Sequence, residues 1–257
     1  MTCPPVPNTA ESAEQTASPP SAITPQAKPW LSVIVPVLDE AATIAAQLGE
    51  LAALRWQGAE LLVVDGGSAD GTARLAHALA DRVLDSVRGR AAQMNAGAAA
   101  SRGEVLLFLH ADTGLPPGAA GLIRAALAAG AAWGRFDVRI DGPQPLLRVV
   151  ERMMNWRSRL TGIATGDQAI FVRREVFERL GGFPDLPLME DIALAKRLKR
   201  VGRPACLRQP VRTSARRWQK HGVVRTILLM WRLRASYFFG ADPRRLAVRY
   251  GYSPRQH

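Results

Sequence analysis

Cysteine is scarce in this sequence, which has two cysteines, Cys3 and Cys206, among its 257 residues. The two lie far apart, no Cys-X-X-Cys pair occurs, and the four histidines do not cluster. This excludes a disulfide framework and leaves no zinc-binding pattern. Such cysteine usage indicates a reducing compartment, so we expect a cytoplasmic protein.

Long apolar runs are also missing, although 47% of the residues are hydrophobic. The longest apolar-rich stretch of the last quarter, residues 222–239, is interrupted by Arg225, Arg232 and Arg234. A helix that spans a bilayer needs roughly 20 consecutive apolar residues, so we expect no spanning helix. Residues 1–29 lack the basic start and apolar core of a signal peptide and are rich in Pro, Ser, Thr and Ala, which predicts a disordered tail.

Acidic residues almost disappear from the last quarter of the chain. From Lys196 to His257 there are 17 Lys and Arg and one acid, Asp242, whereas residues 1–195 carry 17 basic and 21 acidic side chains. This concentration of positive charge suits anionic lipid, a phosphorylated ligand or nucleic acid. The region shows neither aromatics interleaved on a sheet nor a helix-turn-helix pattern, so we expect no nucleic-acid partner.

Residues 216–257 are predicted to form a basic, amphipathic helical segment. Two interpretations of its apolar side stay open. It could rest peripherally in the interface of an anionic membrane, at the inner face of the cell membrane, with arginines reaching the headgroups. Alternatively, it could be an ordinary amphipathic helix packed on the rest of the chain.

The body of the chain, residues 30–215, alternates apolar strands with helical patterns. Residues 31–37, 61–64 and 105–109 are short apolar runs typical of strands buried on both faces, and helical periodicity follows them, over residues 41–54 after the first run. Residues 211–217 are expected to form a further strand and loop. This order predicts an α/β fold with a Rossmann-like, mostly parallel sheet flanked by helices.

Acidic side chains follow three of these predicted strands. Asp39 and Glu40 come after the first, Asp65 after the second and Asp112 after the third. Parallel strands bring their carboxyl ends to one edge of a sheet, where α/β proteins bind ligands. Asp112 could hold a divalent cation against phosphate oxygens, or it could cap the turn before the two prolines that follow. Each single acid has helix capping as its ordinary explanation, but three together favour a site.

Five motifs, in this order, resemble the family 2 glycosyltransferases, which have the GT-A fold: VIVPVLDE, VVDGGSADGT, GRAAQMNAGAAASRGE, FLHADT and GGFPDLPLMED. The resemblance runs from Leu31 to about Gly202. The segments GRFDVRI, TGDQAIFVRR, LPLMEDI and TSARRWQKHG are similar to a narrower subgroup, whose members are associated with radical-SAM or selenodomain proteins or with arsenosugar biosynthesis. Less specifically, the chain resembles enzymes that glycosylate carotenoid acids.

The resemblance implies inverting transfer of a sugar from a nucleotide-sugar, for which we expect a UDP-sugar, to a hydroxyl or carboxyl acceptor. The acceptor would be a lipid, a carotenoid-like acid or a small metabolite. The resemblance assigns the base to Asp191, with Glu190 beside it, and an Mg²⁺ or Mn²⁺ ion to Asp112. The residues implied to bind the nucleotide are Pro36, Asp39, Glu40, Asp65, Ser68, Asp70, Arg90 and Asn95.

The chemistry of such a transfer requires these types of group. The departing nucleoside diphosphate gains charge as the anomeric bond breaks, and a metal and nearby cations stabilise that charge. The acceptor hydroxyl is a weak nucleophile, so a carboxylate must take its proton. For Glu190 and Asp191 the alternative explanation is the helix macrodipole, which favours acids in a first turn.

The sequence departs from the family pattern at His110, which stands where the metal-binding Asp-X-Asp motif has its first carboxylate. The interpretation that we prefer for His110 is a structural histidine at a strand end. Arg216, Arg217 and Trp218 loosely resemble the Gln-X-X-Arg-Trp segment of processive relatives, so the arginines could hold the diphosphate or form a solvated basic face. Residues 166–168 (Gly166, Asp167 and Gln168) lie where related enzymes shape the acceptor pocket, with a simple turn as the equal alternative.

Two other functions are compatible with parts of the sequence. A nucleotidyltransferase would also combine a Rossmann-like sheet with nucleotide and metal, but it would show a Gly-rich loop after the first strand, where this chain has VPVLDE. A protein that binds nucleotide-sugars without transferring the sugar is the second alternative. The presence of Asp65, Asp112 and Asp191 argues against it.

Overall fold

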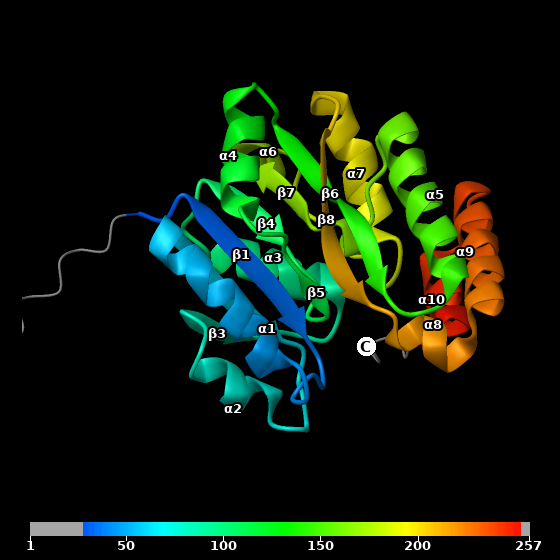
Figure 1. Ribbon diagram of the computed structural model, residues 1–257, viewed down its shortest axis with the longest axis horizontal. Coiled ribbons are helices and arrows are strands. Elements are labelled where there is room, and N and C mark those ends of the chain that lie inside the picture. The colour runs from blue at the N-terminus through cyan, green and yellow to red at the C-terminus, as the bar shows by residue number, and fades with distance from the viewer. Residues whose placement is uncertain (1–27, 253–257) are drawn as a thin grey trace, which may run out of the picture.

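The computed structural model describes residues 28–252 (Figure 1). Almost all of the predicted N-terminal tail therefore lies outside the described residues, as do residues 253–257 of the predicted C-terminal segment. The strands are β1 (Leu31–Val37), β2 (Ala59–Asp65), β3 (Arg82–Asp85), β4 (Val105–Phe108), β5 (Thr113–Gly114), β6 (Trp133–Asp141), β7 (Ile170–Arg173) and β8 (Ala205–Ser214). The α-helices are α1 (Ile44–Leu51), α2 (Thr72–His77), α3 (Arg90–Ala100), α4 (Ala119–Ala128), α5 (Pro145–Thr161), α6 (Arg174–Arg179), α7 (Glu190–Val201), α8 (Arg216–His221), α9 (Val223–Phe238) and α10 (Pro243–Tyr250). The short helices η1 (Ala52–Gln57) and η2 (Gly166–Gln168) are 3₁₀ turns.

These strands form one curled, mixed sheet in the order β3-β2-β1-β4-β7-β6-β8-β5. β3, β2, β1 and β4 run parallel to one another, and so do β6 and β8. β7 is antiparallel to both of its neighbours, and β5 is antiparallel to β8. The predicted α/β class and the parallel half are therefore confirmed, and an antiparallel strand joins the two parallel sets.

The buried strands separate two layers of helices. Every residue of β1 and β4 is buried, as their apolar runs predict. Val33 packs on the face that carries α1 and α4, whereas Ile34 packs on the face that carries α3, α6 and α7. This alternation follows from the two-residue period of a strand.

The parallel half brings the carboxyl ends of β1, β2 and β4 to one edge of the sheet. Val37 lies opposite Asp65 in the register, and Ile34 lies opposite Phe108. The loops after β1 and β4 contain Asp39, Glu40 and Asp112, and Asp65 is the last residue of β2. The edge where these loops meet is the one that carries the site.

Several boundaries differ from those predicted. The helix expected over residues 41–54 is α1 followed by the 3₁₀ turn η1. The strand expected near Val211 begins earlier, at Ala205, and the exposed, polar Arg208 and Gln209 conceal its start in the sequence. β5 is too short to show a periodicity, and it exists because Thr113 pairs with Thr213 of β8.

The C-terminal helices pack on the end of the sheet near α5 (Figure 1). Val223 and Ile227 of α9 contact Leu147 and Val150 of α5, whereas Leu233 packs with residues at the start of α7. Within residues 28–252, no helix has both the length and the apolar character required to cross a membrane.

Candidate active site

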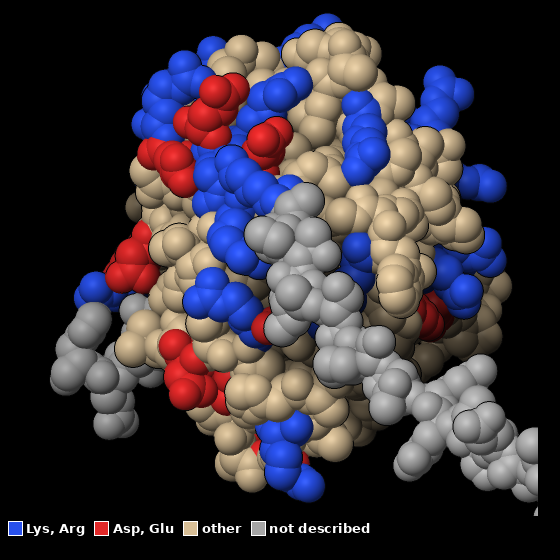
Figure 2. Space-filling model, turned by 90° about the vertical axis from the view of Figure 1, so that its left-hand side faces the viewer, with Lys and Arg blue, Asp and Glu red and all other residues tan. Residues whose placement is uncertain are grey.

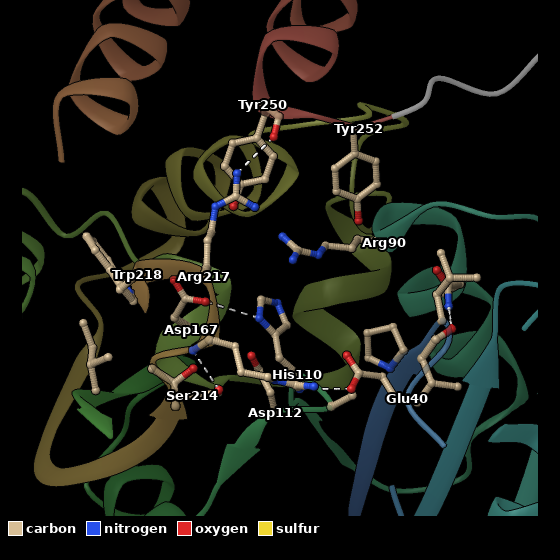
Figure 3. A pocket seen from close by; sticks show the side chains of 18 of the residues that line it. Glu40, Arg90, His110, Asp112, Asp167, Ser214, Arg217, Trp218, Tyr250 and Tyr252 are labelled. Atoms are coloured by element: carbon tan, nitrogen blue, oxygen red, sulfur yellow. Dashed lines mark hydrogen bonds and ion pairs between the residues drawn. The ribbon is translucent and has the colours of Figure 1, made fainter. Parts of the chain in front are cut away.

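A cavity of about 360 Å³ opens at the carboxyl-end edge of the sheet (Figure 3). Its walls come from the ends of β1 and β4, the start of α3, the β8–α8 connection, and residues 250–252. The predicted site residues that line it are Pro36, Glu40, Arg90, Asp112, Asp167, Arg216, Arg217 and Trp218. Segments that lie far apart in the sequence therefore meet in one hollow of the size of a small-ligand site.

Arg90 is the principal cation at the back of this cavity. It begins α3, directly after Gly89, whose φ of 138° suits glycine. Burial alone would lower the pKa of Arg90, but Tyr252 and Glu190 raise it, so the guanidinium stays charged. The first amides of α3 lie beside it, and a helix N-terminus attracts anions. Arg90 and these amides suit a phosphate group.

Two further arginines line the side of the cavity formed by α8. Arg216 donates to the Glu40 carboxylate at 3.0 Å and so joins α8 to the loop after β1. The Arg217 guanidinium lies 3.5 Å from the centre of the Tyr250 ring and donates to the Tyr250 carbonyl oxygen at 3.0 Å. Both guanidinium groups already have partners, and both face the cavity (Figure 3 labels Arg217).

Asp112 is a half-buried carboxylate at the end of the β4 connection. Burial raises its pKa above the ordinary value, and its hydrogen-bond partner is the Thr113 hydroxyl at 3.4 Å. A carboxylate held in this way suits a cation. Within the described residues, no group of three or more His, Cys, Asp or Glu side chains could hold a metal ion. An ion bound to Asp112 would therefore have to take its remaining ligands from phosphate and water, as Mg²⁺ commonly does.

His110 occupies the position of the first carboxylate of the family's metal-binding motif, and its side chain pairs with Asp167. Its Nδ1 lies 3.4 Å from the Asp167 carboxylate (Figure 3). Burial alone would raise the pKa of Asp167, but the contact with His110 holds this pKa below its ordinary value. A side chain at position 166 would collide with His110, so Gly166 permits this close approach. The structure thus brings together two residues from different motifs, which the sequence alone did not predict.

The loops after β1 and β2 bind each other. The Asp39 amide donates to Ser68 Oγ, and the Asp39 carboxylate accepts from the Ala69 amide, both at 2.9 Å. The Asp70 carboxylate accepts from the Ala41 amide at 2.9 Å. Asp65 is 3% exposed and accepts from the Ser68 amide at 3.0 Å. These four predicted nucleotide-binding residues do not line the cavity described above, and their polar groups shape the loops at its side.

Asn95 lies away from the cavity. Its amide group donates to the Phe183 carbonyl oxygen at 2.8 Å and accepts from the Phe183 amide at 2.9 Å. It therefore fixes the Gly-Gly-Phe loop before α7. Gln168 is likewise fully buried and donates to Ser158 Oγ at 3.0 Å, which leaves it no free surface for a ligand.

Glu190 and Asp191 begin α7 beneath His110 and Gly166, where they line a second, much smaller pocket. The Asp191 carboxylate accepts from the Gly166 amide at 2.8 Å and from the amide of Ile192 in its own helix. Glu190 is 4% exposed, and burial, followed by the charge of Asp191, raises its pKa to about 7. A carboxylate that titrates near neutral pH can accept or release a proton at working pH.

Sequence reasoning missed several residues around the site, among them two tyrosines and two arginines. Tyr250 and Tyr252 line the cavity and contact its arginines, but two tyrosines near a chain end carry no signal by themselves. Arg157 of α5 and Arg234 of α9 have buried side-chain nitrogens without hydrogen-bond partners. Burial and the charge of Arg234 lower the pKa of Arg157 to about 10, and Asp191 is the acid near it.

Comparison of the sequence and the fold with known proteins identifies the family of this chain. Residues 32–181 match the family model described as glycosyl transferase family 2. A "PGL/p-HBAD biosynthesis glycosyltransferase" of Mycobacterium tuberculosis (strain ATCC 25177 / H37Ra) is 38% identical over 96 residues, which cover 35% of this chain and 38% of that protein. The chain thus spans less than two fifths of the length of the curated relatives that it matches.

Solved structures agree with this placement. The mannosyltransferase PcManGT from Pyrobaculum calidifontis, solved with GDP-Man and Mn²⁺, is 27% identical with a TM-score of 0.54, and the match covers 77% of this chain and 60% of that one. S. aureus TarS 1–349, solved with UDP-GlcNAc, is 18% identical with a TM-score of 0.57, and the match covers 72% and 58%. TarS supports the fold alone. Because the family model covers more than half of the sequence, the chain belongs to glycosyl transferase family 2, with the GT-A fold.

Proposed function

We propose that this protein is an inverting glycosyltransferase that moves a sugar from a nucleotide-sugar to a hydroxyl or carboxyl acceptor. One observation carries the proposal. In a chain of this family, a single cavity at the carboxyl ends of the parallel strands contains the cation and amides at the start of α3, the carboxylate of Asp112, and the arginines of α8. This combination suits a nucleoside diphosphate with its metal.

The donor would place its diphosphate between Arg90 and Asp112. PcManGT was solved with a GDP-sugar, which supports a nucleotide-sugar donor in general, and from the family resemblance we propose a UDP-sugar. An Mg²⁺ or Mn²⁺ ion held by Asp112 would stabilise the charge of the leaving diphosphate. Arg90, Arg216 and Arg217 add positive charge on the same side. Asp39, Asp65, Ser68 and Asp70 would shape the nucleoside side of the site, with Asn95 behind it.

The proton of the acceptor would pass to the acidic pair that begins α7. We assign the base to Asp191, which the family resemblance implies, with Glu190 beside it. Both oxygens of Asp191 accept backbone hydrogen bonds, which fix the direction of the carboxylate. Residues 166–168 connect this pair to the main cavity, so the acceptor would enter on the side where Asp167 and Trp218 lie.

We propose a lipid or an acid as the acceptor, in preference to a neutral small metabolite. Arg157 and Arg234 each have a buried nitrogen without a hydrogen-bond partner, and Arg157 lies near both Asp191 and Arg234. Two such cations suit an anionic group. The motifs GRFDVRI and TGDQAIFVRR support membership of the radical-SAM, selenodomain or arsenosugar-associated subgroup. We further propose that residues 30–215 form the GT-A unit and that residues 216–257 contact the anionic inner face of the membrane.

A thermal-shift screen tests the donor assignment. UDP, GDP, CDP and their sugars are each added with and without Mn²⁺ or Mg²⁺, because a ligand of the folded state raises its stability by mass action. We expect one nucleotide to raise the melting temperature in a metal-dependent way. If none of them changes it, the nucleotide-sugar site is refuted.

A second function, binding of a nucleotide-sugar without transfer, has one observation in its favour. Glu190 and Asp191 line the small pocket beneath Gly166 and not the main cavity. Release of free nucleotide from the donor in the presence of cell lipid extract separates the two functions. A nucleotide that binds without any release supports the binding protein.

A further inference from the structure

Helix α5 presents the polar side chains of Arg148, Glu151 and Asn155 to β6, and it also presents several apolar side chains to solvent, which is unusual for a surface helix. Val149, Met153, Trp156 and Leu160 are exposed and spaced to share one helical face. Trp156 is 64% exposed. Residues of this kind on a surface helix cost solubility, so the pattern requires a reason.

The polar face of α5 has a structural explanation. From Val138 onward, one edge of β6 has no strand partner and bonds to α5 side chains instead. Asn155 accepts from the Val138 amide at 2.9 Å and donates to its carbonyl oxygen at 3.0 Å. In the same way, the Glu151 carboxylate accepts from the Ile140 amide, and the Arg148 guanidinium donates to the Ile140 carbonyl oxygen. The inward face completes the sheet edge, but nothing in the described residues covers the outward face.

Helix α9 continues this apolar surface. It lies beside α5 at the edge of the molecule, where the two helices pack through Leu147 and Ile227 (Figure 1). The outward positions of α9 include Leu228, Trp231 and Phe238, and Trp231 is 57% exposed. The exposed apolar residues of two neighbouring helices therefore form one patch.

The charges on this patch are all positive. Arg152 of α5 and Arg225 and Arg232 of α9 are exposed among the apolar residues. The acid of these two helices, Glu151, is buried against β6. By contrast, the side of the molecule that faces the viewer in Figure 2 mixes acidic residues with Lys and Arg.

We propose that the outward faces of α5 and α9 form a docking surface for an anionic lipid bilayer. Exposed Trp and aliphatic side chains enter the headgroup boundary, and arginines bind lipid phosphates there. A second copy of the chain fits less well, because a two-fold contact would place arginine against arginine with no acid to neutralise them.

The position of the surface also suits the proposed reaction. Met154 of α5 and Thr226 and Met230 of α9 line the main cavity from the inner sides of the same helices. Docking would therefore place the cavity beside the bilayer, where it could receive a membrane-resident acceptor. This last step rests on the proposed glycosyl transfer, whereas docking itself does not.

Vesicle co-sedimentation of the full chain tests the surface. We expect binding to vesicles of phosphatidylcholine with one third phosphatidylglycerol, about tenfold weaker binding to phosphatidylcholine alone, and release at high salt. The double variant Trp156→Ser/Trp231→Ser should bind the anionic vesicles at least about tenfold more weakly. Trp56→Ser is the matched control, because Trp56 on η1 is 93% exposed and lies outside the patch, and its binding should stay unchanged.

A charge series repeats the test. Arg152→Gln/Arg225→Gln/Arg232→Gln should weaken binding to anionic vesicles, whereas Arg179→Gln, an exposed position on α6, should not. Each variant should keep the thermal stability of the parent, which shows that it is folded.

Two results would overturn the docking surface. The first is a wild-type chain that stays in the supernatant, or a Trp56→Ser variant whose vesicle binding falls as much as that of Trp156→Ser/Trp231→Ser. The second is a dimer, seen by light scattering, that dissociates in the Trp156/Trp231 variant, since that assigns the patch to self-association. The nucleotide screen is read independently, so loss of nucleotide binding with intact vesicle binding refutes the proposed function but not the surface.

Discussion

Replacement of Glu190 by Gln should change how the stability of the protein depends on pH. The Glu190 carboxyl is 4% exposed, and burial beside Asp191 raises its pKa from 4.5 to about 7. Between these two values the folded state binds more protons than the unfolded state, so the stability of the wild type falls as the pH rises through that window. Above pH 7 the folded protein bears the full cost of a buried charge.

The size of the effect follows from the shift. One pKa unit corresponds to 1.36 kcal/mol, so the full cost is about 3 kcal/mol, most of which develops between pH 5 and pH 8. Glu190→Gln has no proton to lose and avoids this cost. The free energy of unfolding of Glu190→Gln should therefore exceed that of the wild type by roughly 2–3 kcal/mol more at pH 8 than at pH 5.

Urea denaturation of both proteins at the two pH values measures this difference directly. Glu175→Gln serves as the matched control, because Glu175 is exposed on α6 and its substitution should give the same difference at both pH values. A gap between Glu190→Gln and the wild type that does not change with pH would refute the raised pKa of Glu190. Its assignment to the proton-transfer pair would then lose its physical basis.

Three further substitutions separate the parts of the site. Asp112→Ala should abolish the metal-dependent part of the nucleotide-induced thermal shift, and an unchanged metal effect would exclude Asp112 as the ligand. Asp191→Asn should bind nucleotide-sugar normally but reduce transfer at least about a hundredfold, since it removes a base; near-normal turnover would remove that role. Asn95→Ala should lower the free energy of unfolding by about 1–3 kcal/mol, because it leaves the amide and carbonyl of Phe183 without partners, while nucleotide affinity stays within a factor of about two.

The parallel half of the fold could be predicted from the sequence because its strands are continuous apolar runs. β1 and β4 are buried on both faces, so hydrophobicity alone marks them. In the other half, the start of β8 and the completed edge of β6 could not be predicted. β8 contains exposed Arg208 and Gln209, and β6 completes its edge with side chains of α5, an arrangement that depends on tertiary contacts and leaves no local pattern.

The candidate site was predictable in composition but not in geometry. The parallel order of the strands places Asp39, Asp65 and Asp112 at one edge of the sheet, and the carboxyl ends of β1, β2 and β4 do meet at that edge. The pairing of His110 with Asp167 depends on two segments that meet only in the folded chain. The same holds for the contact between Arg217 and Tyr250.

The mutual bonding of the loops after β1 and β2 has a consequence for the entropy of ligand binding. Asp39, Ser68 and Asp70 hold these loops in place with bonds between the two segments before any nucleotide arrives. The loss of loop freedom therefore occurs during folding, and a nucleoside would meet a surface that is already ordered. The carboxylates of Asp39 and Asp70 also preserve the shape of these loops. A protein of this fold that had lost its nucleotide ligand would therefore still require these acidic residues.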